Sequence, residues 1–140
     1  MSSHFYWPVR VYIEDTDAGG IVYYVNYLKY MERARTECLR SLGFDKPALP
    51  EEGKLLIVVS VNVNYLRSAQ LDNELFVSAN IIKLAKSYCV FEQTISAAKT
   101  GESDQVYCRG EVKIACVDMQ SRKPVAMPDA MYQAMKKILK

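Results

Sequence analysis

The sequence predicts an α+β fold in which an antiparallel sheet curls around one long helix. A short alternating segment comes first, a long helical pattern follows, and most of the remaining chain alternates with a period of two between turn residues. Hairpin-linked strands pair antiparallel, and a single long helix needs a sheet to cover its apolar stripe. We expect residues 1–140 to form a single domain, long enough to bury roughly two thirds of its unfolded surface.

The first strand is predicted over residues 8–13, where apolar and polar residues alternate. A helix of about five turns is predicted from near Val22 to Gly43, which is a typical C-terminal stop. On one face of it, Arg33 and Glu37 are spaced for an i,i+4 ion pair. Its apolar stripe consists of Leu28, Met31, Cys38, Leu39 and Leu42.

A second stripe near the start of this helix consists of Tyr24, Tyr27 and Met31. Aromatic residues at helical spacing more often belong to a core than to a binding pocket. From spacing alone, both interpretations of this stripe stay open.

Strands dominate the second half of the predicted fold. Residues 46–54 hold prolines, glutamates and a glycine, which indicates a surface loop. Pro128 is expected to open a short C-terminal helix that ends in a basic cluster. Strands are predicted over residues 59–65, 75–81, 89–95 and 106–116, with turns around residues 70–73 and 100–103.

Composition excludes several classes of function. The formal net charge is +2 and no basic tract occurs, so no nucleic-acid partner is expected. No apolar run reaches the roughly 18 residues of a membrane span, and the N-terminus lacks the features of a signal peptide. We expect a soluble, cytoplasmic protein.

The cysteines are expected to be small buried hydrophobes, because none forms a C-x-x-C motif. A catalytic cysteine would normally need a histidine partner, and the only histidine, His4, lies near the N-terminus. The same shortage of ligands argues against a metal site. The four cysteines are Cys38, Cys89, Cys108 and Cys116.

The loop from Glu14 to Tyr24 is the strongest candidate for a functional site. It places Asp17 beside two glycines and before a helix N-terminus, whose first N–H groups have no partner within the helix. A carboxylate beside such donors can attack a carbonyl, or activate water against it, while the donors hold the carbonyl oxygen. Residue type alone favours ordinary capping and turn roles for these residues.

The motifs resemble the 4-hydroxybenzoyl-CoA thioesterase family, and within it the YbgC-like acyl-CoA thioesterases. The signature runs through Arg10-Val11, Thr16-Asp17-Ala18-Gly19-Gly20-Ile21-Val22 and Asn26-Tyr27. Further similarity covers residues 33–37, residues 65–72, Val117-Asp118 and Pro128, and so nearly the whole chain.

This resemblance implies a hotdog fold and hydrolysis of an acyl thioester on coenzyme A or acyl carrier protein, without a cofactor. By resemblance, Asp17 is the nucleophile or general base and the backbone N–H of Tyr24 binds the oxyanion, while Tyr27 contacts the acyl group. Asp15, Glu32 and Glu37 are rival carboxylates outside the signature position. The family also implies active sites shared between two chains, in a homodimer or in a homotetramer built from dimers.

Two positions depart from the family. YbgC-like enzymes usually have a histidine at the position of Tyr24, where the aromatic-acyl enzymes resemble this chain. Leu84 and Ala85 replace an arginine pair ahead of the Lys86-Ser87 step. By resemblance Lys86 and Ser87 remain candidate substrate-binding residues, and other cations that could reach coenzyme A phosphates are Lys83, Lys113, Arg122 and Lys123.

Two other functions compete with hydrolysis. One is a non-catalytic partner that binds an acyl carrier, in which Asp17 is only a helix cap. The other is a hotdog dehydratase, which is disfavoured because such enzymes use a catalytic histidine and His4 is badly placed.

Overall fold

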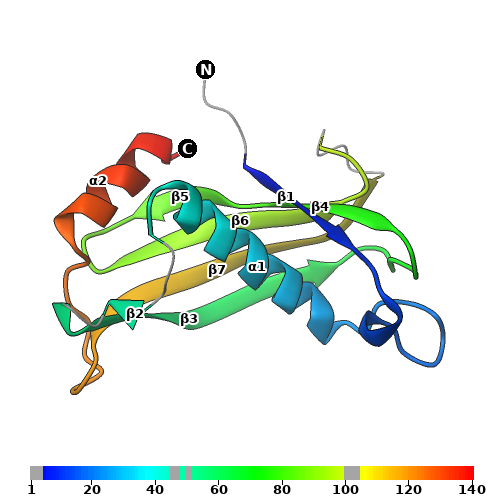
Figure 1. Cartoon of the computed structure of the whole chain (residues 1–140), viewed down its shortest axis with the longest axis horizontal. Coiled ribbons are helices and arrows are strands. Elements are labelled where there is room, and N and C mark those ends of the chain that lie inside the picture. Colours follow the sequence, from blue (N-terminus) through cyan, green and yellow to red (C-terminus); the bar gives the residue numbers. More distant parts are fainter. Residues whose placement is uncertain (1–4, 45–47, 50–51, 100–104) are drawn as a thin grey trace.

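The computed structural model describes residues 5–44, 48–49, 52–99 and 105–140, in which one sheet packs against a long helix (Figure 1). Helix α1 (Val25–Ser41) crosses one face of the sheet, and α2 (Asp129–Ile138) lies at one end. The described strands pair antiparallel in the order β1-β4-β6-β7-β3-β2, with β5 on β6. They are β1 (Tyr6–Arg10), β2 (Ala48–Leu49), β3 (Lys54–Tyr65), β4 (Glu74–Ser78), β5 (Asn80–Leu84), β6 (Tyr88–Ser96) and β7 (Val106–Asp118).

The α+β prediction is confirmed, but the boundaries around the first loop were wrong. Strand β1 ends at Arg10, and Ile13–Asp15 form a short 3-10 helix instead of continuing the strand. Helix α1 begins at Val25, not near Val22. The N–H of Val22 donates to the carbonyl of Ala69 at 2.8 Å, and this tertiary bond holds the chain outside the helix.

Other strand boundaries shift as well. Strand β3 begins at Lys54, earlier than predicted, because it pairs with β7 and carries β2 at its start. The strand predicted over residues 75–81 divides at Ala79 into β4 and β5. The C-terminal helix is confirmed, whereas the turn predicted over residues 100–103 lies outside the described residues.

The predicted ion pair between Arg33 and Glu37 does not form. Glu37 instead pairs with Arg40, one turn farther along α1. The guanidinium of Arg33 lies over the ring of Tyr30, with its carbon 5.7 Å from the ring centroid.

Neither described helix is long and apolar enough to cross a bilayer.

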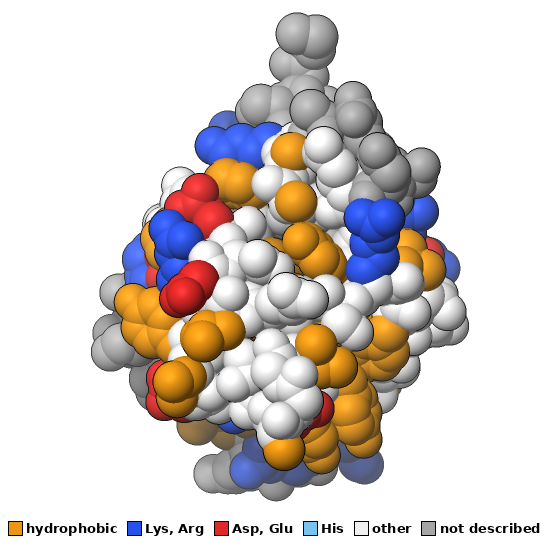
Figure 2. All heavy atoms as spheres, turned by 90° about the vertical axis from the view of Figure 1, so that its right-hand side faces the viewer, with side chains coloured by type: hydrophobic (Ala, Val, Ile, Leu, Met, Phe, Trp, Pro, Cys, Tyr) orange, Lys and Arg blue, Asp and Glu red, His pale blue; other side chains and the backbone are white. Residues whose placement is uncertain are grey.

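The loop before α1 and the loop after β3 meet at one end of the molecule, at the right in Figure 1. Figure 2 views this end directly and shows hydrophobic side chains spread between acidic and basic ones. Several large hydrophobic side chains of these two loops are exposed, namely those of Tyr12, Ile13, Tyr23, Tyr24 and Leu66.

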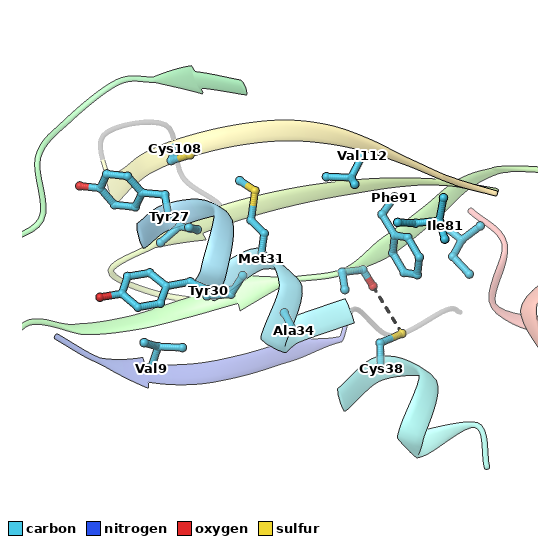
Figure 3. Close-up of a cluster of buried hydrophobic side chains, with 14 of the residues drawn as sticks. Val9, Tyr27, Tyr30, Met31, Ala34, Cys38, Ile81, Phe91, Cys108 and Val112 are labelled. Carbon is cyan, nitrogen blue, oxygen red and sulfur yellow. Dashed lines mark hydrogen bonds between the residues drawn. The ribbon is translucent and has the colours of Figure 1, made fainter. Parts of the chain in front are cut away.

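The core lies between α1 and the inner face of the sheet (Figure 3). Met31 and Ala34 of the helix are fully buried, and Phe91 and Val112 of the sheet are almost completely buried. All four cysteines are free and buried, as predicted. Burial raises the pKa of Cys89 to about 12, so this thiol stays protonated near neutral pH.

Candidate active site

The two loops enclose a pocket of about 310 Å³ at this end of the molecule. Asp17, Tyr24 and Tyr27 line one side of it, and residues 65–68 line the other. Three of the five residues proposed from the sequence therefore lie around one pocket.

Asp17 lies in a tight turn that leaves part of its carboxylate open. The Gly19 N–H donates to Oδ1 at 2.8 Å, and the Gly20 N–H donates to the Asp17 carbonyl at 3.0 Å. Gly20 has φ of 80°, a conformation that favours glycine. Within the described part of the chain Oδ2 accepts no hydrogen bond, so this oxygen is available to a substrate or a water molecule.

Tyr24 provides an unused backbone donor immediately before α1. The Tyr23 N–H donates to the Asp15 carbonyl at 3.0 Å and the Asn26 N–H donates to the Tyr23 carbonyl at 2.8 Å, whereas the N–H of Val25, the first residue of α1, has no backbone acceptor outside the helix among the described residues. Among the described residues the N–H of Tyr24 has no acceptor. This donor belongs to the group of orphan N–H groups at a helix start, where the dipole favours negative charge.

Tyr27 belongs to both the core and the pocket, so the two interpretations of the aromatic stripe are both correct for it. Its side chain is almost completely buried. Its hydroxyl accepts a hydrogen bond from the N–H of Ala69 at 2.9 Å, which ties α1 to the loop after β3. Burial raises its pKa, so the hydroxyl is a neutral structural group.

Sequence reasoning missed the opposite wall of the pocket. The ring of Tyr65 meets Tyr24 edge-on with centroids 5.9 Å apart, and Tyr27 at 5.7 Å. Arg67 places a cation in the same lining. The available signal was the family resemblance of residues 65–72, but a loop that follows an edge strand does not itself reveal which helix it faces.

Lys86 and Ser87 lie in the turn between β5 and β6. In Figure 1 this turn is close to α2 and at the other end of the sheet from the loop before α1. Lys86 lines a separate hollow with Asp129 and Tyr132, and its carbonyl accepts the N–H of Met127. Within one chain these two residues are not part of the pocket around Asp17.

Asp15, the rival carboxylate, has a structural role. Its Oδ2 accepts the N–H of Tyr12 at 2.9 Å, and it does not line the pocket. Behind it the hydroxyl of Tyr30 is buried without a hydrogen-bond partner in the described structure. Burial first, and then the nearby Asp15, raise the pKa of Tyr30.

The chain is similar to known thioesterases over most of its length. A family model described as "Thioesterase-like superfamily" matches residues 11–135. The acyl-CoA thioesterase YbgC of Haemophilus influenzae is 41% identical over 129 residues, which is 91% of each chain. The acyl-CoA thioesterase YbgC of Helicobacter pylori is 33% identical over 85% of this chain and 90% of its own length.

Solved structures show the same fold. A probable thioesterase from Bartonella henselae superposes with a TM-score of 0.76 at 31% identity, covering 90% of this chain and 99% of its own. A 1,4-dihydroxy-2-naphthoyl-CoA thioesterase from Synechocystis has a TM-score of 0.85 at 23% identity, and the superposition covers 97% of this chain and 98% of that one. The antiparallel sheet with one long helix across it is the hotdog fold, and the chain belongs to the thioesterase-like superfamily together with the YbgC acyl-CoA thioesterases.

Proposed function

We propose that this protein hydrolyses acyl-CoA thioesters, with Asp17 and the backbone N–H of Tyr24 as its catalytic groups. One observation supports this most: a residue with an unpaired carboxylate oxygen and a residue with an unpaired backbone donor, Asp17 and Tyr24, line the same pocket. The relatives named acyl-CoA thioesterases support the choice of substrate class.

A thioester needs little acid assistance, because its thiolate is a good leaving group. As a nucleophile, Asp17 would attack the carbonyl carbon, expel the thiolate and form an anhydride that water then hydrolyses. As a general base, it would take a proton from water, whose oxygen attacks the same carbon; the C–S bond then breaks, and the departing thiolate takes up that proton. Both routes place negative charge on the carbonyl oxygen, which the N–H of Tyr24 is available to bind.

A second copy of the chain would complete this site. Strand β3 is paired on one side by β7, and within the described parts of the chain β2 covers only the start of its other side, at Lys54 and Leu55. The rest of this edge carries Val58, Val59 and Val61, whose side chains are 44–52% exposed. Such an apolar edge is a strong candidate for pairing with a second copy, and it leads directly to Tyr65 in the pocket wall.

Assembly into a dimer, or into a tetramer of dimers, would also give Lys86 and Ser87 a route to substrate. In one chain the turn that carries them lies at the other end of the sheet from the loop before α1, so a second copy could bring these residues closer to the pocket. Acyl carrier protein is an alternative carrier of the same thioester.

The decisive variant is Asp17→Asn, which keeps the shape of the side chain and removes its charge. We expect the fold to persist and kcat to fall by about 10²–10⁴, the usual contribution of a positioned acid or base. Turnover is measured with a panel of aliphatic and aromatic acyl-CoA thioesters, and circular dichroism checks the fold.

Glu14→Gln is the matched control, because Glu14 is an exposed carboxylate on the same loop that does not line the pocket. It should keep normal turnover. A folded Asp17→Asn protein with normal kcat would contradict the mechanism, and an absence of turnover in the unmodified protein would favour the non-catalytic acyl-carrier partner.

A further inference from the structure

The side chain of Asn26 connects the loop that carries Asp17 to the start of α1. Asn26 is the second residue of α1 and is only 8% exposed. Its Nδ2 donates to the carbonyl oxygen of Asp15 at 2.8 Å. Asparagine is a mediocre helix former, and a buried amide is costly unless it is hydrogen-bonded. The tertiary bond to Asp15 therefore accounts for this residue better than helix propensity does.

The backbone of Asn26 acts on the candidate oxyanion donor. Its N–H donates to the Tyr23 carbonyl at 2.8 Å. That carbonyl and the N–H of Tyr24 belong to one planar peptide group, which is trans here, so the two point in opposite directions. Holding the carbonyl of Tyr23 therefore also sets the direction of the Tyr24 N–H.

The side chain of Asn26 acts on the neighbourhood of the carboxylate. The Asp15 carbonyl that it binds also accepts the Tyr23 N–H at 3.0 Å, so one oxygen joins the loop to the helix start twice. Only Thr16 separates Asp15 from Asp17, and the Thr16 hydroxyl is itself tied to the carbonyl of Ile13 at 2.8 Å. The path from Asn26 to the Asp17 carboxylate is therefore short and hydrogen-bonded.

We propose that Asn26 is a positioning residue that fixes the Asp17 carboxylate and the Tyr24 N–H in position relative to each other. This inference rests on the proposed function. Asn26 does not line the pocket, so it acts through the two catalytic groups and not through contact with substrate. Its removal should consequently lower kcat and leave KM nearly unchanged, because the interaction that is lost matters in the transition state.

Two variants of Asn26 test the proposal. Asn26→Asp keeps the shape but turns the donor into an oxygen that faces the Asp15 carbonyl, and the resulting displacement should lower kcat by about 100-fold. Asn26→Ala removes the donor without adding repulsion, and we expect a loss of about tenfold. Since the Asp15 carbonyl still accepts the Tyr23 N–H, Asn26→Ala should remain folded. Steady-state kinetics give kcat and KM separately.

A double-mutant cycle with Asp17→Asn separates positioning from general damage. In the Asp17→Asn background, Asn26→Asp should cost little further activity, because the pair that it aligns is already broken. Cys38→Ala serves as the control, because it destabilises the same helix from a buried position far from the loop. When it is assayed well below its melting temperature, this variant should have a normal kcat.

The positioning role would be overturned if the losses of kcat caused by Asn26→Asp and Asp17→Asn multiplied in the double variant. It would also be overturned if Cys38→Ala lowered kcat as much as the Asn26 variants do. Normal kcat in both folded Asn26 variants, beside an inactive Asp17→Asn protein, would overturn the positioning role alone. An active Asp17→Asn protein would instead overturn the proposed function.

Discussion

At the scale of single residues, Tyr24 has two separable parts. Its backbone N–H is unpaired among the described residues, and its side chain is 57% exposed with the ring edge on Tyr65. Its φ of −56° lies within the range of proline, so the N–H can be deleted without changing the local backbone angle. Substitutions at this one position can therefore test the donor and the ring independently.

We predict a graded series at Tyr24. Tyr24→Phe should keep its activity, because both the donor and the ring remain. Tyr24→Ala keeps the donor but loses the ring, so it should change preference among acyl groups by the equivalent of about 1–3 kcal/mol. Tyr24→Pro should lose about 10²–10³ in kcat, as expected for one missing oxyanion donor.

Turnover of this series is compared on aliphatic and aromatic acyl-CoA substrates, and Tyr24→Ala is the internal control for the proline variant. If Tyr24→Phe were as inactive as Asp17→Asn, the hydroxyl would be catalytic. If Tyr24→Pro matched Tyr24→Ala, the backbone donor would have no role.

At the scale of elements, the contact between β7, β3 and α1 depends on Gly110. A Cβ atom there would lie 3.0 Å from a methyl group of Val63, 3.1 Å from the carbonyl oxygen of Asn62 and 3.3 Å from the methyl group of Met31. Side chains can rotate away, but the backbone oxygen belongs to the strand paired with β7. The absence of a side chain lets the two strands and the helix approach each other.

We predict that Gly110→Ala destabilises the protein by about 1–3 kcal/mol, the usual cost of overpacking a filled core. Chemical denaturation measures the free energy of unfolding. The control is Glu111→Ala, an exposed change on the same strand, which should stay within about 0.5 kcal/mol. A neutral or stabilising Gly110→Ala would mean that β3 and β7 separate at little cost.

At the scale of the whole molecule, one edge of β3 is exposed and apolar. Val58, Val59 and Val61 expose apolar surface along a strand whose backbone has, among the described residues, no strand partner on that side beyond Leu55. Natural proteins usually block such edges with charges or cover them. We infer that a second copy covers this edge in solution.

The prediction is that Val61→Lys gives a monomer with little turnover, since an edge lysine opposes strand pairing. Light scattering reports the mass, and activity is measured at the same protein concentrations. Ile82→Lys is the control, because Ile82 is a similarly exposed apolar residue on β5, away from this edge. A fully active monomer at low concentration would contradict both the assembly and the shared site.

The sequence by itself determined the fold class, the long helix, most strands and the identity of Asp17 as the candidate carboxylate. These features depend on local information, namely the alternation of apolar and polar residues in strands, the helical spacing of apolar residues, and the motif around Asp17 in one loop. The cysteines were also predictable as buried, since they lie among apolar residues of the same faces.

Only the tertiary structure decided where α1 begins, which residues form the opposite pocket wall, and that Asn26 joins the loop to the helix. Each depends on backbone groups that meet across the chain, such as the N–H of Val22 with the carbonyl of Ala69. Backbone groups are the same in every residue apart from the missing N–H of proline, so their long-range partners leave no trace in side-chain pattern. Lys86 and Ser87 illustrate the same limit, because folding places the β5–β6 turn that carries them at the end of the sheet opposite the loop before α1.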